Sequence, residues 1–479
     1  MEILEGLFGA IGDLTWGWAL IPLLVVFGVF ITCMTGFVQF TYFGRMWNSL
    51  RSRPDLDESK ISPREALLVS VGGRVGGGNI AGVAVAITLG GPGAVFWMWA
   101  IALVGMATSL VECSLAQLYK RTQPDGDYRG GPARVILHGL GHQYKWLAVV
   151  YAVCLIAAFG LGFNAFQGNT VAGAALDSFG VERLYTGVLL AILTGVIIYG
   201  GIHRIAKAAD VIVPIMAIGY LLMALVVLVL NIGAVPAVLI SILSNAFGFE
   251  EAVSGGMGAV IAQGLRRGLF SNEAGLGSAP NVAATAEVKH PIAQGITQAL
   301  SVFIDTILIC SCTAFVILLG DVYVPGAADV NGVALTQQSM VSHLGGWASY
   351  FLTVAIFLFA FSSIIYNYYL GENALTVMTK NPISVHVFRI VVVGIVLLGA
   401  TAPGATSVFF FSDPMMGVLA VVNLLVIMML FPVALRILRD YHEQAKAGVE
   451  YPVLDPDKFA DLDIDRTAWP KPAQAAAAS

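Results

Sequence analysis

The sequence predicts an all-α polytopic membrane protein, and two observations lead to that fold class. Of the 479 residues, 57% are hydrophobic and only 11% are charged, whereas a soluble domain carries about 25% charged residues. Apolar runs of about 18 or more residues recur along the chain, and each can cross a hydrocarbon core of roughly 30 Å. The short segments of alternating polarity that mark a membrane β-barrel are absent from the sequence. We therefore expect a bundle of transmembrane helices.

Eleven apolar segments are candidates for transmembrane helices. They are residues 14–40, 65–88, 93–119, 146–170, 184–201, 208–231, 252–282, 291–320, 345–371, 384–402 and 413–436. The first follows an acidic start that lacks the basic region and cleavage site of a signal peptide, so we expect it to be retained as a span.

Basic residues alternate between the loops and predict the orientation. They follow spans one, three, five, seven, nine and eleven, whereas the loops 232–251, 321–344 and 403–412 contain neither Lys nor Arg. Cytoplasmic loops carry the excess of Lys and Arg. We therefore expect a protein of the inner (plasma) membrane with its N-terminus outside and its C-terminus in the cytoplasm, which agrees with an odd number of spans.

Two of the eleven spans are interrupted by glycine. The second contains VGGRVGGGNIAG (Val71–Gly82), and the seventh contains RRGLFSNEAGLGSAPN (Arg266–Asn281). Non-helical backbone at membrane depth survives only where it is buried in protein or lines a cavity. Such breaks at matching positions of two halves point to the binding site of a secondary transporter. Close helix packing is the alternative explanation of the glycines in the second span.

The position of the two breaks also predicts the organisation of the chain. They lie five spans apart, so spans 2–6 and 7–11 form two sets of opposite topology, each beginning with a broken helix. The expected units are an extra helix and loop (1–64), a first repeat (65–231), a second repeat with an outer loop (232–436) and a tail (437–479). We expect this polar, acidic tail to be cytoplasmic and largely disordered.

A broken transmembrane helix has a specific chemistry. Free N–H groups at the start of a half-helix suit a carboxylate, and unwound carbonyl groups suit a cation such as Na⁺. Gly76, Gly77 and Gly78 would keep side chains out of the way. The cargo that fits is a small zwitterion together with a metal ion. The cluster is not G-x-G-x-x-G, so nucleotide binding is not expected.

Polar side chains within other spans have two explanations each. Asn164 and Gln167 share a helix face, where they could contact cargo or bond to a neighbouring helix. Ser362 and Ser363 could face a site or bond back to their own helix. We find no nucleophile–base pair or metal cluster with a plausible arrangement, so an enzyme is not expected.

Three segments resemble those of a known family. GGPGAVFWMWAIALVG (Gly90–Gly105), RVGGGNIAGVAVAI and the second glycine-rich segment are similar to hallmark segments of the alanine or glycine:cation symporter family, the sodium:alanine symporters. The resemblance extends from about residue 14 to 440. It implies Na⁺-coupled uptake of alanine or glycine on the LeuT-type inverted-repeat fold, with spans 2–6 and 7–11 as the repeats.

The resemblance also implies site residues. The carbonyl groups of Gly72 and Val75 would hold Na⁺ together with Ser362 and Ser363. The substrate would lie against the first break and its surroundings. The backbone amides of Gly77 and Gly78 would bind its carboxylate. The implied substrate-binding residues are Gly76, Gly77, Gly78, Asn79, Gln167, Phe270, Ser271 and Asn272. The family commonly has Thr at the position of Gly77, and the lost hydroxyl and gained space leave the substrate preference open.

Several alternatives stay open at this stage. Arg74 either replaces a second sodium ion beside the substrate or pairs with Asp305 or Glu112. Coupling to H⁺ through Glu273 or Asp305 competes with coupling to Na⁺, and a channel or receptor that binds without pumping is a third possibility. The sequence does not distinguish alanine, glycine and serine, or fix the Na⁺ stoichiometry or the oligomeric state. No nucleic-acid partner is expected.

Overall fold

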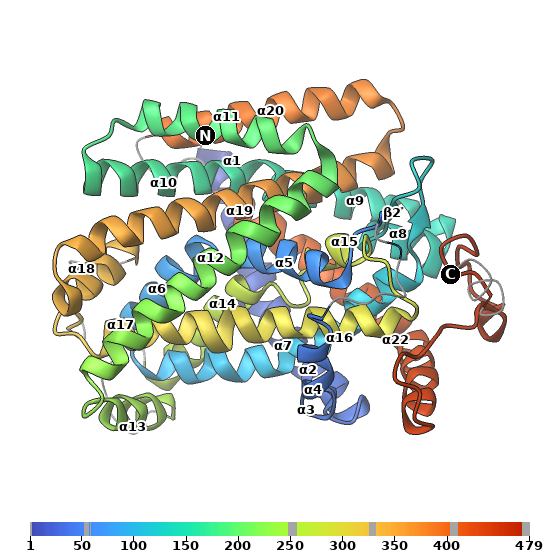
Figure 1. The fold of residues 1–479 in the computed structure, drawn as a ribbon, viewed down its shortest axis with the longest axis horizontal. Coiled ribbons are helices and arrows are strands. Elements are labelled where there is room, and N and C mark those ends of the chain that lie inside the picture. The colour runs from blue at the N-terminus through green and yellow to red at the C-terminus, as the bar shows by residue number, and fades with distance from the viewer. Residues whose placement is uncertain are drawn as a thin grey trace.

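The computed structural model describes residues 2–51, 57, 59–247, 256–324, 332–402 and 411–471. Within these residues the chain is helical apart from loops and one small hairpin, in which β1 (Arg121–Thr122) pairs with β2 (Tyr128–Arg129). Figure 1 shows long helices packed side by side around a central group that includes α5, α7, α14, α16 and α19. The all-helical fold class is confirmed.

Eight helical runs in the described residues are long and apolar enough to cross a membrane. They are Gly6–Met34 (most of α1, and α2), Gly93–Leu118 (α7), His142–Phe179 (including α9 and α10), Gly201–Leu230 (α12), Pro291–Leu318 (α16 and α17), Trp347–Met378 (α19), Pro382–Thr401 (α20) and Ser412–Lys446 (α22). A ninth candidate is the bent pair of Pro63–Arg74 (α5) and Gly78–Gly90, which ends in α6 (Val83–Gly90). The protein is thus a multi-pass membrane protein.

The two remaining predicted spans are also helical but shorter. They are α11 (Arg183–Ile198) and the pair of α14 (Gly256–Asn272) and α15 (Ala279–Ala283). Every predicted span therefore coincides with a helix, while eleven crossings and the inverted repeat remain predictions.

Some segments expected to be loops contain helices. The predicted outer loops hold α13 (Val235–Ala246) and α18 (Gly332–Leu344), and the predicted inner loops hold α4 (Phe43–Asn48) and α8 (Pro132–Val135). Helix α3 (Val38–Thr41) begins within the predicted first span and ends in the loop after it. Residues 248–251, 325–331 and 403–410 of the predicted outer loops and residues 252–255 of the predicted seventh span lie outside the described residues.

The first break forms at the end of a well-capped helix. Ser62 and Glu65 make a reciprocal capping box at the start of α5, and Pro63 occupies its first turn. The helix ends at Arg74, and Val75 adopts an extended backbone (φ −73°, ψ 96°). The chain resumes as a helix at Gly78, bent by 53° from α5. The predicted interruption of the second span is confirmed.

The second break follows α14. Glu273 has φ 54°, and Gly275 and Gly277 have φ 82° and 85°. Positive φ is costly for residues with a Cβ atom and easy for glycine, so the two glycines let the chain turn here before α15 begins. The predicted interruption of the seventh span is also confirmed.

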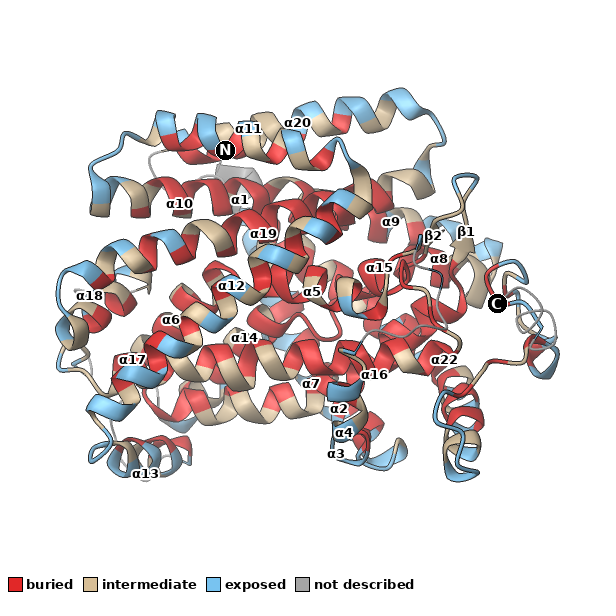
Figure 2. Cartoon of the chain, in the orientation of Figure 1, coloured by how far each residue is buried: buried red, intermediate tan, exposed pale blue. Residues whose placement is uncertain are grey.

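Burial follows the layout of a membrane bundle. Figure 2 shows buried residues concentrated in the centre and exposed residues along the outer helices α11, α12 and α20. The exposed residues of these helices include apolar ones such as Leu189, Ile215 and Ile390. An apolar outer face is the surface that lipid tails require, so the packing agrees with the composition.

The expectation of a largely disordered tail is wrong for residues 437–471. Helix α22 extends to Lys446, and the segment beyond it packs on the β1–β2 hairpin and its surroundings, with Phe459 and Trp469 each only 2% exposed. Asp463 pairs with Arg121 and His138, each at 2.7 Å. The buried surface of this segment comes from a few aromatic residues, which its polar average composition does not reveal. Residues 472–479 lie outside the described residues.

Candidate functional site

The end of α5 meets the middle of α19 at a set of neutral oxygen atoms. The Ser362 hydroxyl donates to the Gly72 carbonyl oxygen at 2.8 Å. The Ser363 hydroxyl lies 3.2 Å from the same oxygen and 3.0 Å from that of Gly73. Both hydroxyls also bond to the carbonyl of Phe359, so the serine pair bonds back to its own helix while it contacts the end of α5. Such carbonyl and hydroxyl oxygens are the ligands a hard cation prefers.

The predicted ion ligands are partly brought together by this contact. Gly72, Ser362 and Ser363 meet, and Gly73 joins them. The hydroxyls do not bond to Val75, which is the residue at which the backbone leaves the helix. No group of three or more His, Cys, Asp or Glu in the described chain could hold a metal ion. A monovalent cation held by neutral oxygens is therefore what this arrangement suits.

The turn formed by Gly76, Gly77 and Gly78, called the glycine turn below, lies in close contact with helices α10, α14 and α19. A Cβ atom on Gly76 would lie 2.7 Å from the Ser363 Oγ and 3.0 Å from the Gln167 Nε2. On Gly77 it would lie 3.3 Å from the Phe166 ring, and on Gly78 it would lie 3.5 Å from the Phe270 ring. These contacts bring α10 and α14 to the turn. At Gly76 only glycine fits without displacement of its neighbours.

Asn79 connects the two broken helices. Its amide nitrogen donates to Ser271 at 3.0 Å and to the Asp305 carboxylate at 2.6 Å, and its amide oxygen accepts from the Gly76 backbone at 2.9 Å. Ser271 and Thr306 also donate to that carboxylate, at 2.9 and 2.7 Å. The Asp305 carboxylate thus anchors both breaks.

Two predicted binding residues have buried polar atoms without a partner among the described residues. They are the Gln167 Oε1 and the Asn272 Nδ2. An unpaired buried polar atom costs about 1–3 kcal/mol, which a bound ligand could recover. Gln167 faces the glycine turn. Asn272 accepts a bond from the Ala274 amide at 3.0 Å, but no described contact brings it to the turn.

Arg74 makes hydrogen bonds rather than an ion pair. Its side chain is 3% exposed and donates to Ser301 and, at 3.4 Å, to Ser109. It has no ion pair with any acidic residue of the described chain, so the expected direct pairing with Asp305 or Glu112 is wrong. The guanidinium still acts electrostatically on Glu112, Glu273 and Asp305. It supplies the positive charge between the two breaks.

Glu112 and Glu273 stabilise the second break. Glu112 accepts from the Gly275 amide at 3.3 Å and from Asn423 at 3.0 Å. Glu273 accepts from Ser278 at 2.5 Å and from Tyr366 at 3.3 Å. Glu112 therefore satisfies a backbone donor of the break, whereas Glu273 connects the break to the Tyr366 hydroxyl of α19.

The sequence missed three parts of the site. The sequence indicates Asp305 as a partner of Arg74 or a proton carrier, but not as the anchor of Asn79 and Ser271. Phe163, whose ring centroid lies 5.4 Å from that of Phe270, and Phe166 add aromatic surface beside the glycine turn. The aromatic residues flanking Gln167 in GFNAFQGN were the available signal.

Two broken helices that meet inside a membrane bundle define the class of secondary transporters. Comparison with known proteins agrees. The model of the sodium:alanine symporter family matches residues 1–456, and the chain belongs to this family. It is a transporter of a sodium-coupled amino-acid symporter family and is not an enzyme, so both expectations are confirmed.

Relatives match the chain over most of its length. It is 46% identical to the amino-acid carrier protein AlsT of Bacillus subtilis over 91% of this chain and 92% of that protein. It is 45% identical to the probable sodium/glutamine symporter GlnT of the same organism, over 93% and 92%. It is 37% identical to the sodium/alanine symporter AgcS of Methanococcus maripaludis, over 92% and 98%. These names show that substrates differ within the family.

Proposed function

We propose that this protein imports a small neutral amino acid, alanine and/or glycine, together with Na⁺ by alternating access. The observation that carries the proposal is the meeting of the Ser362 and Ser363 hydroxyls with the carbonyls of Gly72 and Gly73. These neutral oxygens lie where a transmembrane helix is broken. A cation bound there would join α5 to α19, and its binding would therefore favour one arrangement of the two helices over another.

The adjoining glycine turn supports the choice of substrate. The amides of Gly77 and Gly78 are proposed to bind the carboxylate, close to the Na⁺, with Gly76, Asn79 and Ser271 shaping the turn. Phe270 and Gln167 line the space beside it. These aromatic rings beside the turn are proposed to restrict the substrate to a short side chain, which would favour alanine and glycine over glutamine.

We propose one Na⁺ per substrate. Arg74 supplies a fixed positive charge between the breaks, within electrostatic range of Asp305 and Glu273. A second cation beside the substrate would be repelled by this charge. Charge-flux measurements in proteoliposomes are expected to give one net charge per alanine, and two would contradict the proposal.

The proposed orientation places the N-terminus outside and the C-terminus in the cytoplasm of the inner membrane, as the Lys and Arg distribution predicts. Within the two five-span repeats, 65–231 and 232–436, one bundle of helices would rock around the site at the membrane midplane. Reaction of single introduced cysteines with an impermeant thiol reagent tests this orientation.

Uptake into proteoliposomes tests the function. With an inward Na⁺ gradient, radiolabelled alanine or glycine is expected to accumulate above its external concentration, while glutamine is expected to compete weakly. Replacement of Na⁺ by choline at fixed pH is expected to abolish accumulation. Undiminished uptake in choline would contradict Na⁺ coupling, and equilibration without accumulation would indicate a channel.

Coupling to H⁺ is the second candidate, and Asp305 is the observation that favours it. Its carboxylate is fully buried and accepts from three neutral donors beside the glycine turn. A buried carboxylate in a transporter can carry a proton. A pH gradient without Na⁺ would then drive accumulation, and Asp305→Asn would abolish that uptake.

A further inference from the structure

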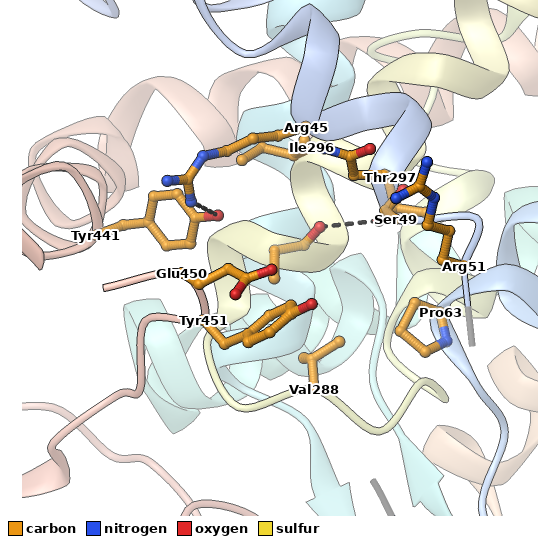
Figure 3. Close-up of a pocket in the computed structure, with 12 residues that line it drawn as sticks. Arg45, Ser49, Arg51, Pro63, Val288, Ile296, Thr297, Tyr441, Glu450 and Tyr451 are labelled. Atoms are coloured by element: carbon orange, nitrogen blue, oxygen red, sulfur yellow. Dashed lines mark hydrogen bonds between the residues drawn. The ribbon is translucent and has the colours of Figure 1, made fainter. Parts of the chain in front are cut away.

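A cavity of about 280 Å³ lies away from the transport site, at the end of the bundle that carries the tail. Helices α4 and α16, the first residue of α5, the end of α22 and the segment after α22 line it. Figure 3 shows Arg45, Ser49 and Arg51 on one side and Glu450 and Tyr451 on the other. The cavity is lined by charges of both signs.

The two arginines differ in how they are held. Arg45 donates to the Tyr441 hydroxyl at 3.1 Å and lies over the Tyr42 and Tyr441 rings. The backbone N–H of Arg51 donates to the Asn48 carbonyl at 3.1 Å, but its exposed side chain makes no hydrogen bond or ion pair with any described residue and is available to a ligand. Two guanidinium groups of this kind, one fixed and one available, suit a phosphate group.

Glu450 is the one acidic residue among the described residues that line the cavity, and it restricts which phosphate-bearing ligand fits. Glu450 is exposed and makes no ion pair with a described residue. A purely anionic ligand would meet repulsion from its carboxylate, whereas a ligand that carries an ammonium group next to its phosphate would not. The charge pattern therefore matches a zwitterion.

The surroundings of the cavity point to lipid as the source. The α3–α4 segment continues from the α2 span and carries three exposed aromatic residues, Phe37 (52%), Phe40 (61%) and Trp47 (42%). Aromatic residues that are not needed for a core gather at the membrane–water boundary. Arg45 lies in α4 and Arg51 lies just after it, so the cavity that they line sits at headgroup depth.

We propose that this cavity binds the headgroup of a phospholipid of the phosphatidylethanolamine class. Arg45 and Arg51 hold the phosphate, and Glu450 accepts a hydrogen bond from the primary ammonium group. Pro63 lines the same cavity and begins α5, the helix that ends at the first break. The bound lipid is therefore in contact with the start of the helix whose end forms the transport site.

The test compares three lipids with the same acyl chains and the same phosphate. The full-length purified protein is mixed with phosphatidylethanolamine, phosphatidylcholine or phosphatidylglycerol, and the retained lipid is counted by native mass spectrometry. Phosphatidylcholine lacks N–H donors and phosphatidylglycerol lacks the cation. Phosphatidylethanolamine is expected to be retained roughly two- to fivefold more than either, which is the range for one exposed charge pair.

Variants assign the preference to the cavity. Glu450→Gln is expected to remove the preference for phosphatidylethanolamine, while Glu443→Gln, also exposed but outside the cavity, is expected to keep it. Arg51→Gln is expected to lower retention of all three lipids, and Arg439→Gln is the matched control. Equal retention of the three lipids, or an unchanged preference in Glu450→Gln, would overturn the proposal. So would equally tight binding of chain-free phosphoethanolamine.

Discussion

Replacement of Gly76 by alanine tests the glycine turn most sharply. The added Cβ atom would lie 2.7 Å from the Ser363 Oγ and 3.0 Å from the Gln167 Nε2. The first distance is about 0.8 Å short of an ordinary contact of roughly 3.5 Å. Overpacking of this kind costs about 1–3 kcal/mol. Because the displaced side chains belong to the proposed ion and substrate sites, the cost falls on binding.

The expected result is a large loss of affinity in a folded protein. A cost of about 1–3 kcal/mol corresponds to a Kd for alanine raised roughly 5- to 150-fold at saturating Na⁺. Isothermal titration calorimetry of the detergent-purified variant measures the Kd, and a thermal unfolding curve shows that the protein remains folded.

Two neighbouring glycines supply controls. On Gly82 a Cβ atom would meet nothing within 4 Å, so Gly82→Ala is expected to leave binding unchanged. On Gly78 it would make an ordinary 3.5 Å contact with Phe270, so Gly78→Ala is expected to have an intermediate effect. Equal affinities for Gly76→Ala and Gly82→Ala would refute the reasoning.

Three further predictions follow from the site and from the buried Lys120. Ser363→Ala is expected to weaken Na⁺ binding roughly 10- to 150-fold, since a polar contact to a charged group contributes about 1.5–3 kcal/mol. The control is Ser342→Ala, which removes a hydroxyl that bonds to Ser339 in its own helix. Equal Na⁺ affinities of the two variants would contradict the ion site. Gly77→Thr is expected to fold, because the nearest contact of its Cβ is a 3.3 Å approach to the Phe166 ring. The variant is expected to change the ratio of alanine affinity to glycine affinity. An unchanged ratio would show that this position does not set the substrate preference. The folded protein is expected to gain stability from pH 7 to 9, because burial lowers the pKa of Lys120 to about 7. A base whose pKa is lower in the folded than in the unfolded state favours the folded state as the pH rises. Thermal unfolding at pH 7 and at pH 9 measures this, and a lower unfolding temperature at pH 9 would contradict it.

The sequence predicted the breaks because their chemistry is local. Clustered glycines and a proline within apolar runs are visible without any tertiary information, and both breaks occur where they were expected. The meeting of Gly72 with Ser362 was implied only by resemblance to a family, because contacts between residues 290 positions apart have no local signature.

Other features required the structure. Asp305 is one charge in an apolar run until Asn79 and Ser271 are seen to converge on it from two other helices. The docked tail was hidden by its polar composition, because the burial of Phe459 and Trp469 depends on a surface assembled from distant segments. Average composition describes a segment alone and not the partners that bury it.

The central claim is that Na⁺ and the amino acid bind at adjoining parts of one broken helix. Calorimetric titration of alanine at a series of Na⁺ concentrations, with choline keeping the ionic strength constant, tests it most directly. The alanine affinity is expected to rise with Na⁺, and saturating alanine is expected to raise the Na⁺ affinity by the same factor, as linkage requires. Ser363→Ala is expected to shift this dependence to higher Na⁺ concentration. An alanine affinity that is the same in choline as in Na⁺ would contradict the claim.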